Sequence, residues 1–216
     1  MRPGSQASRP PASLLACLSH PVVMWHGAQR WQGPPEVVPQ PPTSAEHGPG
    51  IYMTTSAEFA REYAKGGGVL VRFEVDPGLT LLEDVQMPLA DAVEFVRSRP
   101  RLKSRGVLIS DLEANAARMR PREIRLGRAT ESSPMMIWSE VVLNLFVNHR
   151  AIAGDQGPAL ARFFVEHGID ASIVTRGTDD WLVVFNPKII RSWRVVPAKH
   201  AEDAPRLRGR VGPKDR

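Results

Sequence analysis

The order of hydrophobic patterns along the chain restricts its fold more than any other feature. Between residues 88 and 167, apolar residues recur at spacings of three and four, which is typical of helices. Short apolar runs of the kind that form strands stand on both sides of this block, at residues 21–27, 50–54, 69–76, 170–174, 181–186 and 191–196. Strands that flank one helical block, without regular alternation of strand and helix, indicate an α+β fold.

A proline-rich stretch separates the first two predicted strands. Six prolines stand between Gln32 and Pro49. Proline donates no backbone hydrogen bond and disrupts helices, so this stretch predicts a long surface loop. Long loops in compact domains are commonly functional or disordered.

The predicted helix after the second strand has a clear start and stop. Thr55 and Glu58 have the spacing of a capping box, and Gly66, Gly67 and Gly68 follow the apolar positions. A helix is therefore expected from this box to about Lys65.

The chain is expected to hold one domain between two loose ends. Residues 1–20 begin with a Pro-, Ser- and Arg-rich segment that has too few apolar residues to bury a face, and they are predicted to be disordered. The domain is predicted over residues 21–195, and residues 196–216 form a basic tail. Residues after Trp193 contribute +4 of the net charge of +5, so the domain itself is nearly neutral.

Cysteine usage and hydropathy restrict the compartment. The single cysteine, Cys17, excludes an intrachain disulfide and a multi-cysteine metal site, and no histidine spacing suggests a metal ligand set. No apolar stretch approaches the roughly 20 residues of a membrane helix. We expect no metal, no membrane partner and a cytoplasmic location.

Three short motifs stand on or beside predicted strands. They are "WHG" at 25–27, "GPGIY" at 48–52 and "DDWLVVFNP" at 179–187. In this order they resemble the ADP-ribosyltransferase superfamily, a group of NAD-using enzymes that includes poly-ADP-ribose polymerases, bacterial toxins and phage-type domains. The resemblance implies a split antiparallel or mixed β-sheet core with a helical insert.

The resemblance also implies roles for named residues. His26 would bond a ribose hydroxyl of NAD, and the Gly27 backbone would hold the nicotinamide amide. Tyr52 would stack on the nicotinamide ring, and Tyr63 would close its other side. Gly48 and Gly50 are expected to let the backbone turn tightly beside the ligand.

The position of the catalytic carboxylate depends on how the last motif is aligned. The longer pattern of the family places Asp180 there, with Asp179 in reserve, whereas the shorter pattern places Trp181 there. A slip of one residue moves a side chain to the other face of a strand. Asp180 is the preferred assignment, with His26 and Tyr52 as its catalytic partners.

The resemblance implies an enzyme that moves ADP-ribose from its co-substrate NAD to an acceptor and releases nicotinamide. The acceptor is left open among protein, nucleic acid and small molecule, and an antitoxin or a nucleic acid is a further candidate partner. Two alternatives stay open. One is an NAD glycohydrolase or a tRNA 2′-phosphotransferase-like enzyme, and the other is a catalytically silent module that binds NAD or nucleic acid.

Overall fold

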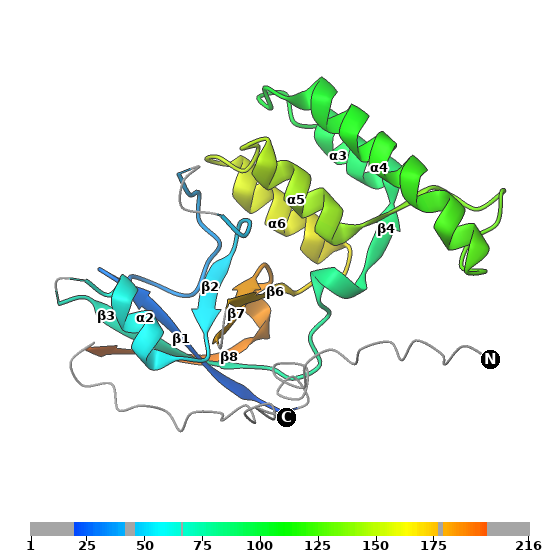
Figure 1. Ribbon diagram of the computed structural model, residues 1–216. Helices are drawn as coiled ribbons and strands as arrows, with labels where there is room; N and C mark the ends of the chain where they lie inside the picture. The colour runs from blue at the N-terminus through cyan, green and yellow to red at the C-terminus, as the bar shows by residue number, and fades with distance from the viewer. Residues whose placement is uncertain (1–19, 42–45, 66, 177–178, 198–216) are drawn as a thin grey trace, which may run out of the picture.

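The computed structural model describes residues 20–41, 46–65, 67–176 and 179–197, and Figure 1 shows the path of the chain. The predicted N-terminal segment lies outside these residues except for His20. The predicted tail also lies outside them, apart from Val196 and Pro197, which end the last strand.

Six strands form one sheet in the order β6-β7-β2-β1-β3-β8, and every neighbouring pair is antiparallel. They are β1 (Val22–Ala28), β2 (Ile51–Thr54), β3 (Val69–Val75), β6 (Ala171–Arg176), β7 (Asp179–Val184) and β8 (Ile190–Pro197). All six coincide with predicted strands to within two residues. The prediction of an α+β fold is confirmed at this level.

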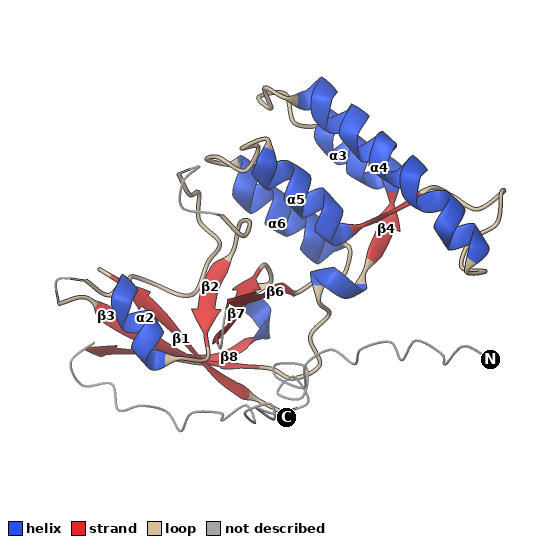
Figure 2. Cartoon of the chain, in the orientation of Figure 1, coloured by secondary structure: helices blue, strands red, loops and turns tan. Residues whose placement is uncertain are grey.

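The helical block lies between β3 and β6, as predicted. It contains α3 (Leu89–Arg97), α4 (Arg105–Arg125), α5 (Ser139–Asn148) and α6 (Gln156–Glu166). Figure 2 shows α5 and α6 beside the strands, with α3 and α4 farther out. Two 3₁₀ turns, η1 (Leu82–Asp84) and η2 (Pro187–Ile189), join these parts to the sheet.

A small ribbon inside the helical block was not foreseen. Strands β4 (Gln86–Pro88) and β5 (Met136–Trp138) pair antiparallel and connect the outer helix pair to the rest. Residues 137–138 had been placed in a helix. Three residues are too few to show the two-residue alternation of a strand.

The helix α2 (Ala57–Tyr63) begins one residue later than expected. Its N-cap is Ser56, whose side chain accepts a hydrogen bond from the Phe59 amide at 3.1 Å. The capping box predicted at Thr55 is therefore wrong. Serine and threonine are both good caps, so neighbouring candidates are separated only by the backbone that the fold imposes.

The two faces of the sheet bury different cores. Ile51 and Met53 of β2 pack with residues of β1, β3 and β7 in one cluster. Tyr52, between them in sequence, packs against the cluster that includes α5, α6 and Phe185. A third, smaller cluster joins Trp25 of β1 to α2. Alternation along short strands thus decides which side chains reach which face.

Candidate functional site

The candidate site lies where β1 and β2 separate. The strands pair at Trp25 and Thr54, and this is the one Cα pair between them. By contrast, β1 pairs with β3 along its full length. Beyond Trp25, the imidazole Nδ1 of His26 bonds the carbonyl oxygen of Tyr52 at 2.7 Å. A side chain therefore bridges the two strands where the backbone ladder ends.

A pocket of about 420 Å³ opens at this separation, within the range of small-molecule sites. Its lining residues come from β1, β2, α2, β7 and the loop between β1 and β2. They are Trp25, His26, Gly27, Gln40, Glu46, His47, Tyr52, Met53, Thr54, Ala60, Tyr63 and Trp181.

Four of the residues predicted to bind NAD share this pocket. His26 and Gly27 come from β1, Tyr52 from β2 and Tyr63 from the last position of α2. Tyr63 is half exposed, whereas His26 and Tyr52 are partly buried. The fold thus brings together residues that lie up to 37 positions apart in sequence.

His26 has a defined hydrogen-bonding character. Because a carbonyl oxygen can only accept, Nδ1 carries the proton in the bond to Tyr52. Burial lowers the pKa of His26, and the bond to Tyr52 opposes this shift only in part. At neutral pH, His26 is therefore uncharged, and its Nε2 is an acceptor suited to a hydroxyl donor.

Gly27 is required by packing. A Cβ atom at this position would lie 1.7 Å from the carbonyl oxygen of Ala60 and 3.1 Å from the Cβ of Tyr63. Only glycine lets α2 approach β1 this closely. Gly27 therefore helps to place Tyr63 at the pocket.

The glycines before Tyr52 pack against protein. Gly48 has a φ of +99°, and a Cβ there would meet the side chain of Leu143 in α5 at 2.5 Å. A Cβ at Gly50 would meet Val183 of β7 at 2.6 Å. The tight turn was expected, but its closest neighbours are α5 and β7.

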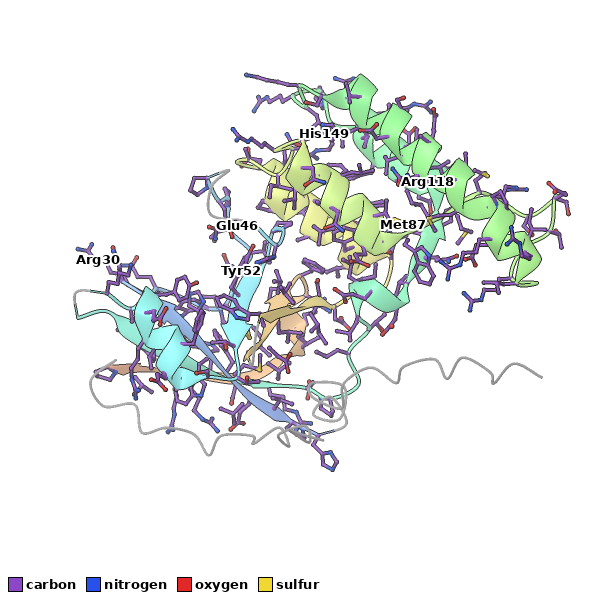
Figure 3. All side chains as sticks on the ribbon, viewed as in Figure 1. Arg30, Glu46, Tyr52, Met87, Arg118 and His149 are labelled. Atoms are coloured by element: carbon purple, nitrogen blue, oxygen red, sulfur yellow. The ribbon has the colours of Figure 1, made fainter. Side chains whose placement is uncertain are left out.

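The hydroxyl of Tyr52 holds the end of the proline-rich loop. It donates to the Gly48 carbonyl oxygen at 2.7 Å and accepts from the His47 amide at 3.2 Å. These bonds fix the loop next to the ring. Figure 3 shows Glu46, on this loop, close to Tyr52 at the start of β2.

Trp181 forms an aromatic wall of the pocket. Its ring lies edge-to-face against Tyr52, with centroids 6.5 Å apart, and against Tyr63, with centroids 5.7 Å apart. Its indole N–H and that of Trp25 are buried, and no described residue accepts a hydrogen bond from either. A buried donor without a partner costs about 1–3 kcal/mol, a cost that a ligand acceptor would offset.

Asp180 is placed differently from its neighbour. It is 91% buried in β7, opposite Thr175 of β6, and its carbonyl oxygen accepts from the Thr55 amide at 3.4 Å. Among the described residues that line the pocket, Trp181 is present and Asp180 is not. Side chains alternate along a strand, so the pocket face of β7 belongs to Trp181. The catalytic assignment of Asp180 stays a prediction, and Asp179 lies at the first position of the same strand.

A second hollow of about 280 Å³ adjoins the first and shares His26, Gln40 and Tyr52 with it. Arg30 and Glu36 contribute the charged side chains of its wall. The two hollows form a divided cleft. One part is aromatic, and the other contains an arginine.

Sequence reasoning missed three lining residues, Gln40, Glu46 and His47, all from the proline-rich loop. The loop has no periodic pattern from which a direction could be deduced. Its length was the one usable signal, because long ordered loops often carry function.

Comparisons of this chain with protein-family models, curated proteins and solved structures give no match. In the part of the chain that the structure describes, no group of three or more potential ligands could hold a metal ion. None of the described helices is long and apolar enough to span a membrane.

Proposed function

We propose that the pocket between β1 and β2 binds NAD as a substrate and that the protein transfers ADP-ribose from it to an acceptor. One observation carries the proposal. The residues selected by resemblance, His26, Gly27, Tyr52 and Tyr63, line one pocket although three separate elements supply them.

The chemistry of the lining residues fits a dinucleotide. Neutral His26 offers Nε2 to a ribose hydroxyl, and the aromatic rings offer flat surfaces to the nicotinamide. The buried N–H groups of Trp25 and Trp181 suit an acceptor such as a carboxamide oxygen. Arg30, in the adjoining hollow, suits a phosphate.

The transfer breaks the bond between ribose C1′ and the nicotinamide nitrogen. The bonding electrons go to the ring nitrogen, so the ring loses its positive charge while C1′ becomes electron-poor. The acceptor then bonds C1′ and loses a proton. A carboxylate near C1′ would stabilise the developing charge.

Two carboxylates are candidates for this role. Asp180 is the one expected from the sequence, whereas Glu46 lines the pocket. The two differ in position, so single substitutions with the corresponding amide distinguish them.

The test is nicotinamide release from NAD by the purified full chain, with and without a cell lysate. Release that requires lysate supports transfer, and release without it supports an NAD glycohydrolase. Label from NAD that remains on lysate material is then digested with protease or with nuclease to identify the acceptor class. Binding of NAD with no release in either condition would contradict the transferase proposal.

One observation favours a second function, a silent NAD-binding module. Trp181 occupies the position of β7 that faces the pocket, where the shorter alignment expects a carboxylate. A tryptophan can bind a ring but cannot stabilise a cationic sugar as a carboxylate does. NAD binding with no nicotinamide release would support this alternative.

A further inference from the structure

The pocket concentrates the aromatic side chains of an aromatic-poor chain. Only 6% of the residues are aromatic, and the chain has two tyrosines and five tryptophans. Both tyrosines and two of the tryptophans line this one pocket. Such clustering points to a ligand that binds aromatic surfaces.

The rings of this wall stand at right angles. The plane of Trp181 makes 85° with that of Tyr52 and 83° with that of Tyr63. The pocket is therefore bounded by aromatic surfaces of more than one orientation. Clusters of this kind recognise cations, because each ring face carries negative charge density.

The charges around the pocket agree with this. Glu46 lines it, whereas no lysine or arginine does. Burial lowers the pKa of His26, so this residue adds no positive charge at neutral pH. The arginine of the cleft, Arg30, belongs to the adjoining hollow.

We propose that the aromatic wall of Tyr52, Tyr63 and Trp181, with Glu46 beside it, selects a positively charged ring. The inference rests on the proposed function in one respect, since it identifies that ring as the pyridinium of oxidised NAD. Reduced NAD, whose nicotinamide ring is neutral, binds less tightly.

The selection has a consequence for product release. When the bond to ribose breaks, the nicotinamide ring becomes neutral and loses its attraction to the wall. Free nicotinamide is therefore a weak competitor of NAD, although it is the leaving group itself.

The test compares two small probes of the same shape. 1-Methylnicotinamide is a cation, and 3-methylbenzamide is its neutral counterpart, with carbon in place of the charged nitrogen. Both carry the carboxamide, so their difference reports charge. Calorimetric or NMR titration of the full chain is expected to show about tenfold tighter binding of the cation, the scale of one cation–π contact. Oxidised and reduced NAD are compared in the same way.

Two exposed positions give variants that are expected to fold. Tyr63→Leu removes one ring, and Glu46→Gln removes the charge without changing shape. Each is expected to reduce the preference for the cation. Glu62→Gln, an exposed change on α2 away from the pocket lining, is the matched control and should leave the preference unchanged.

Equal binding of the two probes, or no binding of either, would overturn the inference, as would a preference that survives in both pocket variants. Its failure is separable from that of the proposed function. Preference for 1-methylnicotinamide without NAD binding would support the cation site and contradict NAD as its ligand. NAD cleavage without charge preference would do the reverse.

Discussion

The Nδ1 atom of His26 lies 2.7 Å from the carbonyl oxygen of Tyr52, and this bond spans β1 and β2 at the place where their backbones cease to pair. It sets the tautomer of the imidazole and links two residues of the pocket wall. The first prediction follows from this bond and from the burial of the ring.

Acid should destabilise the protein through His26. Its folded pKa lies below the ordinary value of 6.5, so the unfolded chain binds the proton more readily. The contribution of neutral His26 is present above pH 6.5 and is lost as pH falls through 6.5 toward the lowered pKa. NMR titration of the imidazole should show a midpoint below 6.5.

Urea denaturation between pH 7.5 and pH 5 provides the second measurement for His26. The loss of stability should be smaller in His26→Asn than in the natural protein. Equal losses in the two proteins would show that His26 does not contribute.

Gly27→Ala should destabilise the fold and disturb the pocket together. Its Cβ would overlap the carbonyl of Ala60 and force α2 away from β1. Overpacking of this kind costs about 1–3 kcal/mol, measurable by urea denaturation. Gly106→Ala is the control, because no atom lies within 4 Å of its Cβ and its place in α4 favours alanine. Similar effects of the two substitutions would contradict the packing argument.

The catalytic carboxylate can be identified by comparing amide variants. If Glu46 stabilises the cationic ribose, Glu46→Gln should lower NAD turnover on the order of 10²–10³-fold, with a smaller effect on NAD binding. An equally large loss in Asp180→Asn, with unchanged thermal stability, would return the role to Asp180. Asp179→Asn serves as the control for charge removal on β7.

Trp181→Glu asks whether a carboxylate on the pocket face of β7 can work. An increase in turnover would identify the natural protein as a weakened or silent member of the resembled family. A loss of NAD binding without gain of turnover would show that the indole itself is needed.

Glu83→Gln should alter the pH dependence of stability in the alkaline direction. Burial raises the pKa of Glu83, against the bonds that it accepts from Ser172 at 2.5 Å and the Ile173 amide at 3.1 Å. The folded state then holds the proton more tightly than the unfolded state. The stability that Glu83 contributes is present below its unfolded pKa and is lost as pH rises through the raised value.

Thermal denaturation from pH 4.5 to pH 8 should therefore show a smaller decline in Glu83→Gln than in the natural protein. Glu94→Gln, an exposed change on α3, is the control and should leave the profile unchanged. A steeper decline in Glu83→Gln would contradict the raised pKa.

The elements themselves followed from local patterns. Strand and helix positions such as Val69–Val75 and Leu89–Arg97 were predicted because the side-chain period of a strand differs from that of a helix. The set of His26, Gly27, Tyr52 and Tyr63 also came from short motifs that stand at element ends. What failed locally was the three-residue ribbon of β4 and β5, which is too short to show a period.

The sequence by itself therefore determined the class of fold and the residues that one side of the pocket displays. Only the tertiary structure decided that Trp181 rather than Asp180 lines it, and that Glu46 reaches it from the proline-rich loop. The physical reason is that strand register is set by pairing with another strand, here Thr54 opposite Trp181. Similarly, the course of a loop is set by distant anchors such as the Tyr52 hydroxyl. Neither is encoded in a local pattern.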